Sequence, residues 1–93
     1  MIIVTVKATP ILRFKQEYIN QFRKIAEVVR KENGCLEYEI YQKVADTPEL
    51  FIFERWSSKE ALDAHLQSEH MIHFFSYTSS WFAKNKEMDI YQL

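Results

Sequence analysis

The seven residues Leu50–Trp56, LFIFERW, constrain the fold of this chain more than any other stretch. They alternate as a β-strand does, with successive side chains on opposite faces of a sheet. Large apolar side chains fall on both faces, so this strand needs cover from both sides. The two sets are Leu50, Ile52, Glu54 and Trp56 on one face, and Phe51, Phe53 and Arg55 on the other.

The rest of the chain supplies three more strands and two helical regions. Period-two alternation and β-branched residues indicate strands, whereas apolar residues three or four apart indicate helices. The short turn Asp46–Pro48 predicts that the second and third strands form a hairpin. The expected elements are a strand over Met1–Thr9, a helix from Phe14 towards Gly34, strands over Leu36–Val44 and Leu50–Trp56, a helical region from Ser58, and a strand over Lys86–Leu93.

Local signals predict where the helices begin and end. Gly34 follows a basic segment and suits the left-handed residue that closes a helix. Ser57 with Glu60 forms a capping-box pattern, and Ser68 with Glu69 indicates a restart, so two short helices or one kinked helix both fit. The expected inward side of the first part is Ala61, Leu62, His65 and Leu66, and the second part is expected to carry Ile72, Phe75, Ser79 and Phe82.

The order strand, helix, strand, strand, helix, strand predicts an α+β fold of the ferredoxin-like βαββαβ type. Such a fold has a four-stranded antiparallel sheet with its helices on one face. The other face then carries Phe51 and Phe53, with Tyr41 on the neighbouring strand. A second copy of the sheet covers such a face most simply, so we expect a homodimer.

Composition excludes several classes of protein. The 93 residues suffice for one domain, which we expect to span 1–93, and 47% of them are hydrophobic. With 12 basic and 13 acidic residues, the chain has no basic stripe for nucleic acid and no polybasic membrane patch. A lone Cys35 and the absence of a secretion signal favour the cytoplasm.

Three histidines and a glutamate lie close together in the sequence, but they do not predict a metal site. His65 and Glu69 are four residues apart, and His70 and His73 are three apart. One helix cannot direct all four side chains at a single ion. Glycine-rich phosphate loops and dinucleotide fingerprints are also absent, so we expect neither metal nor cofactor.

Glu54 and His65 are the strongest candidates for chemistry. Glu54 occupies an otherwise apolar register of its strand, where a carboxyl needs a hydrogen-bond donor such as His65 or Tyr38. His65 lies on the apolar side of its helix and is expected to face Glu54 and Trp56. Such a pair is typical both of proton-transfer sites and of purely structural contacts.

Aromatic side chains are expected to form the walls of a pocket near this pair. Most aromatics at helical spacing belong to a core, yet an aromatic cavity with a few polar groups suits a flat, hydroxylated ligand. Catalytic candidates are therefore Glu54, Trp56 and His65. The side chains expected to contact a substrate are Tyr38, His70, Phe74 and Trp81.

Two stretches of the chain resemble the antibiotic biosynthesis monooxygenase family, especially its small quinol-monooxygenase-like members. They are ENGCLEYEIYQ, residues 32–42, and FERWSSKEALDAHLQSEHM, residues 53–71. Members of that family are dimeric α+β barrels, which agrees with the fold expected from periodicity. The resemblance implies a monooxygenase that uses neither flavin nor metal, in which an aromatic pocket deprotonates a phenol or hydroquinone that then reacts with O₂.

Not every branch of the family fits equally well. Trp56 matches a pocket tryptophan of an anthrone-oxidising member, but Ile52 and Leu62 stand where that enzyme has an amide and a tyrosine. Haem-degrading members use an Asn, a Trp and a His where Thr5, His65 and Phe75 stand here. Two alternatives stay open: an isomerase of a small phosphorylated sugar-like signal molecule, and a non-catalytic module that binds a small ligand in a stress response.

Overall fold

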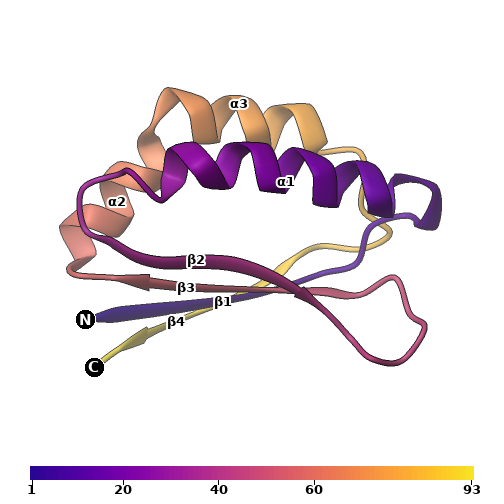
Figure 1. Ribbon diagram of the computed structural model, residues 1–93, viewed down its shortest axis with the longest axis horizontal. Coiled ribbons are helices and arrows are strands. Elements are labelled where there is room, and N and C mark those ends of the chain that lie inside the picture. Colours follow the sequence, from indigo (N-terminus) through magenta and orange to yellow (C-terminus); the bar gives the residue numbers. More distant parts are fainter.

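The computed structural model describes residues 1–93 and contains one four-stranded sheet in the order β2-β3-β1-β4 (Figure 1). Every neighbouring pair of strands is antiparallel. All helices cover one face of the sheet and leave the other uncovered (Figure 1). The predicted ferredoxin-like α+β fold is thus confirmed. The elements are β1 (Ile2–Ala8), a 3₁₀ turn (Leu12–Phe14), α1 (Lys15–Val29), β2 (Cys35–Gln42), β3 (Leu50–Trp56), α2 (Lys59–Gln67), α3 (Glu69–Thr78) and β4 (Glu87–Gln92).

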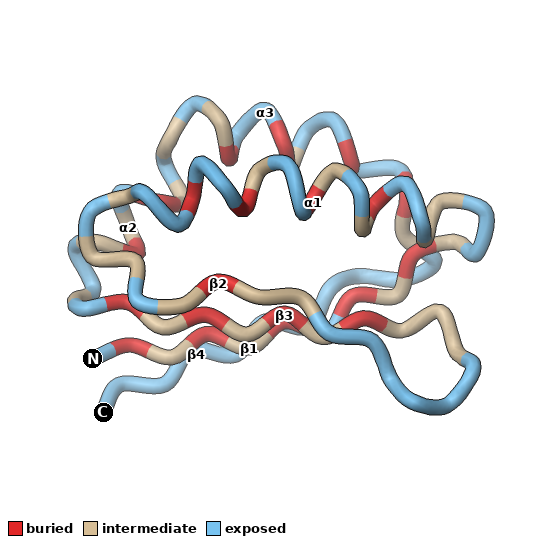
Figure 2. The backbone as a smooth tube through the Cα atoms, viewed as in Figure 1, coloured by how far each residue is buried: buried red, intermediate tan, exposed pale blue.

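The register of the sheet places Glu54 at the centre of its helix-covered face. Glu54 pairs with Tyr38 of β2 on one side and with Val4 of β1 on the other. Burial alternates along β1 and β3, so the side chains that share this face lie in the core (Figure 2). Helix α1 packs onto them through the predicted apolar stripe, whose buried members are Tyr18, Phe22, Ala26 and Val29.

The segment between α1 and β2 departs from the expected helix end. Helix α1 stops at Val29, and the next turns are tightened by bonds from Lys31 N to Val28 O and from Glu32 N to Val29 O. Gly34 has the predicted left-handed conformation, with φ of +85°. A Cβ there would lie 2.5 Å from the Ala61 Cβ, so glycine lets this segment press against the start of α2.

The start of α2 differs from the prediction by one residue. Ser58, and not Ser57, is the N-cap: its hydroxyl accepts a hydrogen bond from Ala61 N at 3.1 Å. The N–H of Ser57 donates to Gly34 O at 2.8 Å, which prolongs the pairing of β3 with the chain before β2 and leaves no N–H for the Glu60 carboxylate. The capping-box prediction for Ser57 and Glu60 was therefore wrong.

The restart at Ser68 is confirmed, and of the four residues expected after it Phe75 and Phe82 pack against the core, whereas Ile72 and Ser79 are exposed. The Ser68 hydroxyl accepts from Met71 N at 3.3 Å, and its extended backbone separates α2 from α3. This break resets the helical phase, so Ile72 is exposed and Ser79 lies beyond the helix. The side chains that α3 buries are Met71, Phe74 and Thr78.

The uncovered face of the sheet carries large apolar side chains that are partly exposed to solvent. Phe51 and Phe53 are half-buried there by their neighbours, while Tyr41 and Tyr91 are about half exposed, at 48% and 49%. The register of β2 shifts between residues 35 and 37, and Leu36 at this irregularity is exposed. No helix is both long and apolar enough to cross a bilayer.

Candidate active site

A small cavity lies between the sheet and the helices, on the side of β4. Its volume is about 50 Å³, and apolar side chains from β1, β3, α2 and α3 make most of its wall. Only a few of its lining residues carry polar groups. They are the carboxyl of Glu54, the imidazole of His65, the phenols of Tyr18 and Tyr38, and the ammonium of Lys86.

Glu54 is the buried acid of this cavity, with 5% of its surface exposed. Its Oε1 accepts a hydrogen bond from the indole Nε1 of Trp56 at 3.0 Å, whereas Oε2 has no partner in the chain. Burial raises the pKa of Glu54 to about 7, the charge of Glu32 acts in the same sense, and the bond from Trp56 opposes them. The sequence predicted His65 or Tyr38 as the hydrogen-bond donor to Glu54. This prediction was wrong, because Trp56, two residues along the same strand, is the donor.

His65 is buried between two carboxyl groups. Its Nδ1 lies 3.0 Å from Glu32 Oε2 and 3.2 Å from Oε1, and its Nε2 lies 3.9 Å from Glu54 Oε1. Because a carboxylate only accepts hydrogen bonds, Nδ1 carries the proton and Nε2 presents a lone pair. Burial lowers the pKa of His65, against the opposite effect of Glu32, so the neutral imidazole is favoured near neutrality.

Glu32 is a site residue that sequence reasoning missed. Its Oε2 also accepts from His70 Nε2 at 2.8 Å, so two imidazoles hold one carboxylate. His70 is therefore joined to the site through Glu32 and does not line the cavity. Glu32 is 33 residues from His65, and no spacing rule connects them. The available signal was its place at the start of the family-like stretch, residues 32–42.

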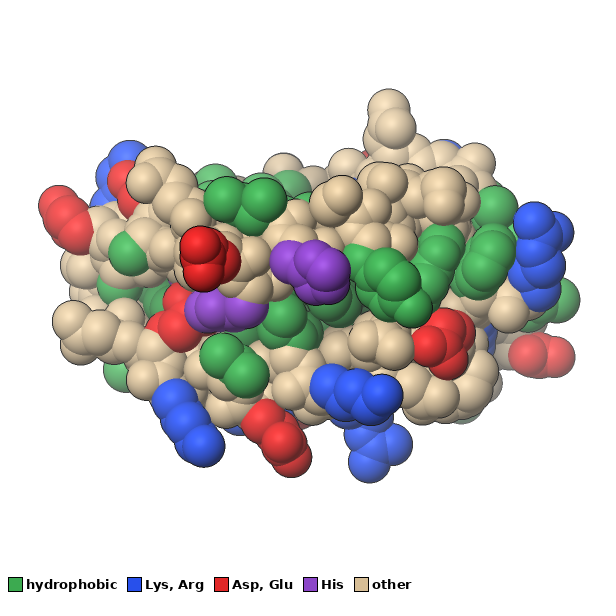
Figure 3. Space-filling model, turned by 90° about the horizontal axis from the view of Figure 1, so that it is seen from above, with side chains coloured by type: hydrophobic (Ala, Val, Ile, Leu, Met, Phe, Trp, Pro, Cys, Tyr) green, Lys and Arg blue, Asp and Glu red, His purple; other side chains and the backbone are tan.

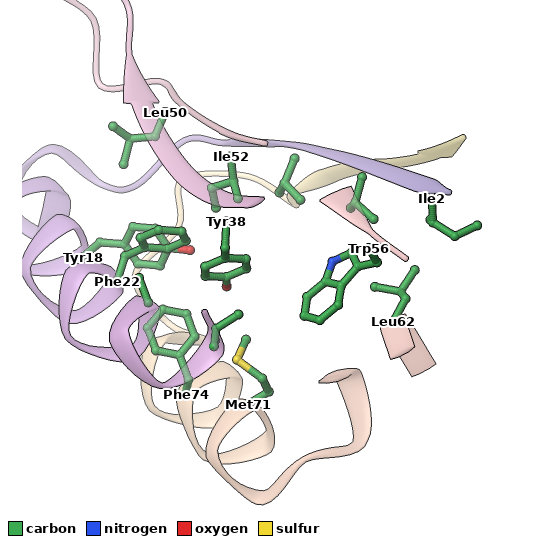
Figure 4. Packing of buried hydrophobic residues seen from close by; sticks show 14 of the residues in the cluster. Ile2, Tyr18, Phe22, Tyr38, Leu50, Ile52, Trp56, Leu62, Met71 and Phe74 are labelled. Atoms are coloured by element: carbon green, nitrogen blue, oxygen red, sulfur yellow. The ribbon is translucent and has the colours of Figure 1, made fainter. Parts of the chain in front are cut away.

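Two buried phenols face the cavity without a hydrogen-bond partner in the chain. Tyr38 was expected in a pocket, whereas Tyr18, from the buried face of α1, was not among the predicted site residues. The rings come from β2 and α1 and lie in the layer between the sheet and the helices (Figure 4). Burial, followed by the charge of Glu54, raises the pKa of both phenols above the ordinary value, so both remain protonated donors.

The structure gathers some of the other predicted residues and separates the rest. Phe74 lines the cavity as expected. Trp56 lies behind Glu54, with its ring 4.5 Å from the imidazole of His65. Trp81 does not reach the cavity, because it stacks on Phe14 with ring centroids 5.4 Å apart.

Histidine side chains are also visible on the helix-side surface (Figure 3). His73 is exposed and stacks on Tyr77, with ring centroids 6.1 Å apart. No group of three or more His, Cys, Asp and Glu side chains is arranged to hold a metal ion. The three imidazoles thus occupy different environments: His65 is buried at the cavity, His70 is half-buried against Glu32, and His73 lies in solvent.

Comparison with known proteins extends this picture. The family model "Antibiotic biosynthesis monooxygenase" matches residues 1–77. The chain belongs to this family. The match includes Tyr18, Glu32, Glu54 and His65, and it confirms the resemblance drawn from residues 32–42 and 53–71.

Curated relatives agree with this membership. The chain is 32% identical over 79 residues to "Probable quinol monooxygenase YgiN" of Escherichia coli, covering 75% of each protein. It is 44% identical over 45 residues to Rv0793 of Mycobacterium tuberculosis, which is 48% of this chain and 44% of that protein. For YjcS of Bacillus subtilis the match spans 53% of that protein, so the chain spans about half the length of these two relatives.

Solved structures show the same fold. A conserved protein from Methanosarcina mazei, 31% identical, superposes with a TM-score of 0.92 over 98% of this chain and 90% of its own. The structure of Rv0793, which is 24% identical, superposes with a TM-score of 0.91 over 99% of this chain and 93% of its own. At this low identity, the likeness to Rv0793 concerns the fold alone.

Replacing Glu54 with Gln should change how stability depends on pH. The pKa of Glu54 rises from its ordinary 4.5 to about 7 on folding, so the folded protein holds this proton more tightly than the unfolded chain. This contribution is complete below pH 4.5 and is lost as pH rises through about 7. The free energy of unfolding of Glu54→Gln minus that of the wild type should therefore rise by about 3 kcal/mol across this range.

Urea denaturation at a series of pH values measures this difference, from which the titration of groups common to both proteins cancels. Glu60→Gln, which removes an exposed carboxyl at the start of α2, is the matched control. A difference for Glu54→Gln that stays constant from pH 4.5 to 7 would contradict the raised pKa.

Proposed function

We propose that this protein is a cofactor-independent monooxygenase that oxidises a hydroquinone or another phenolic aromatic with O₂. The observation that carries the proposal is the buried Glu54 carboxyl, with a pKa near neutrality, beside the neutral His65 in an apolar cavity. Family membership and the similarity to YgiN, which is named a quinol monooxygenase, support the reaction class.

Glu54 suits the first step, which is removal of a phenolic proton. A base with a pKa of about 7 is about half ionised at neutral pH and is stronger than an ordinary carboxylate. Transfer from a phenol with a pKa of about 10 is uphill by about three units, or about 4 kcal/mol. That is well within the barrier of an enzyme reaction with a turnover of seconds.

His65 provides a second acceptor at the same place. Its Nε2 lone pair faces Glu54 across 3.9 Å, a gap that is too long for a direct hydrogen bond. A substrate hydroxyl can bond to either group, and Glu32 holds the imidazole in the required tautomer. The two groups therefore form one acceptor site with a carboxyl and an imidazole side by side.

The overall reaction balances without an external reductant. A hydroquinone with a free ring carbon reacts with one O₂ to give a hydroxyquinone and one water. Oxidation of the two hydroxyls provides two electrons, and conversion of the ring C–H to C–OH provides two more. One oxygen atom enters the ring and the other leaves as water, so the protein needs to supply only a base, orientation and a dry cavity.

An aromatic ring enters this cavity only if its wall moves, because about 50 Å³ holds only a few water molecules. The wall contains side chains that adapt readily. Met71 and Met88 are unbranched and flexible, and Phe75 is only half-buried. Opening on the β4 side therefore requires side-chain rearrangement and not a change of fold.

The proposal includes a homodimer in which the uncovered sheet faces pack against each other. This face carries Phe51 and Phe53 between the half-exposed Tyr41 and Tyr91. A partner sheet removes these side chains from water, and each fully buried large apolar side chain contributes about 1.5–3 kcal/mol. The single Cys35 and the absence of a paired cysteine support a cytoplasmic location.

Oxygen uptake tests the activity. With a panel of hydroquinones, wild-type protein should consume O₂ above the rate of autoxidation, and anaerobic incubation should leave the substrates unchanged. Because a general base contributes roughly 10²–10⁴-fold, Glu54→Gln should lose activity on that scale, and His65→Ala should also be slower.

His73→Ala is the matched control for His65→Ala, since it removes an exposed imidazole from the neighbouring helix. Uptake no faster than autoxidation for every substrate, together with no effect of His65→Ala, would exclude the monooxygenase.

Sedimentation velocity tests the dimer. Phe51→Asp places a charge in the middle of the proposed interface, and its desolvation should yield monomer or aggregate at concentrations where the wild type is dimeric. Val28→Asp, a similar change on the exposed side of α1, should leave the sedimentation coefficient unaltered. A Phe51→Asp profile identical to that of the wild type would rule out the sheet-to-sheet interface.

A further inference from the structure

We propose that Tyr18 and Tyr38 form a two-donor site that binds the oxygen of a phenol and stabilises it as the phenolate forms. This inference rests on the proposed function and specifies how its substrate class is recognised. Both side chains line the cavity that contains Glu54, and only 1% of Tyr18 and 4% of Tyr38 is exposed.

The hydroxyls of Tyr18 and Tyr38 lack hydrogen-bond partners within the chain. Neither phenol forms a side-chain hydrogen bond within the chain, and each hydroxyl oxygen keeps some accessible surface although most of its residue is buried. Polar groups in a protein interior are almost always hydrogen-bonded, because leaving one unpaired is unfavourable. Both tyrosines line the same cavity, so a molecule inside it provides a hydrogen-bond partner for them.

Aromatic neighbours hold the rings of Tyr18 and Tyr38 in place. Tyr38 stacks on Phe22 with ring centroids 4.9 Å apart and planes within 6° of parallel. Tyr18 meets Phe82 edge-on at 5.1 Å. Figure 4 shows both tyrosines among the packed side chains beneath the sheet. Donors fixed in this way need little reorganisation when charge develops on a bound oxygen.

The two phenols also favour the negative charge that develops on the substrate oxygen. Before proton transfer the negative charge of the cavity resides on Glu54, and afterwards it resides on the substrate oxygen. Both tyrosines stay protonated, so they donate throughout and do not compete for the proton. Hydrogen bonds to an anionic oxygen are about twice as strong as those to a neutral one. The donors therefore favour the phenolate over the bound phenol.

Other charged groups leave this assignment unchanged. Lys86 is the only cationic side chain of the wall, and its ammonium lies 4.9 and 5.0 Å from the ring centroids of Phe82 and Phe75. His65 is neutral and presents a lone pair, so it accepts and does not donate towards the oxygen. Besides Lys86, the donors that line the cavity are thus the two phenols.

Binding of p-nitrophenol tests the site, because its absorbance distinguishes phenol from phenolate. Tyr18→Phe and Tyr38→Phe each remove one hydroxyl and keep the ring. Each should raise the pKa of the bound probe by about one unit and weaken phenolate binding about tenfold. Tyr77→Phe, which removes an exposed phenol from α3, should bind the probe as the wild type does. Thermal melts check that the variants fold.

The measurement needs no O₂, so it separates this inference from the monooxygenase proposal. Raised probe pKa values in both cavity variants support the site even if no substrate is oxidised. Wild-type protein that fails to bind the probe, or cavity variants that bind it with wild-type pKa and affinity, would overturn the site even if oxygen uptake is found.

Discussion

The proposed chemistry of this protein depends on a carboxyl group buried in the helix-covered face of the sheet. Strand pairing on both sides of β3 holds Glu54 in the core, and it receives a single hydrogen bond, from Trp56. One neutral donor does not replace the hydration of an ionised carboxylate, so the pKa rises until the group titrates near neutrality. In the proposed function, the same burial that disfavours its charge makes Glu54 the base.

The environment of His65 depends on contacts between segments that are distant in sequence. Glu32, from the turns after α1, orients the imidazole, and His70 of α3 holds the other side of that carboxylate. Ser68 stabilises the junction of α2 and α3 by donating to His65 O at 2.7 Å. Gly34 allows the Glu32 segment to approach α2 closely. The groups around His65 are thus brought together by two connections of the fold, the one between α1 and β2 and the one between α2 and α3.

Local patterns predicted what local physics determines. Alternation in LFIFERW defined β3 and its two faces, and it also exposed Glu54 as a polar residue in an apolar register. Helical spacing placed His65 opposite it. Long-range contacts had no such signal: Glu32 looked like a charged residue at a helix end, and Tyr18 looked like core. Trp81 was misplaced because its aromatic character indicates burial but does not indicate which cavity it borders. The break at Ser68 also changes which residues of α3 point inward, and no local pattern predicted that change.

The central claim, that a phenolic oxygen binds between Glu54 and His65, is tested most directly by a crystal structure of the protein with a dihydroxyaromatic, grown without O₂. The account predicts a ligand hydroxyl within hydrogen-bond distance of Glu54 Oε2 or His65 Nε2, in a cavity enlarged on the β4 side. A ligand bound only outside this cavity, for example in the groove between α1 and α3 beside His73 and Tyr77, would contradict it.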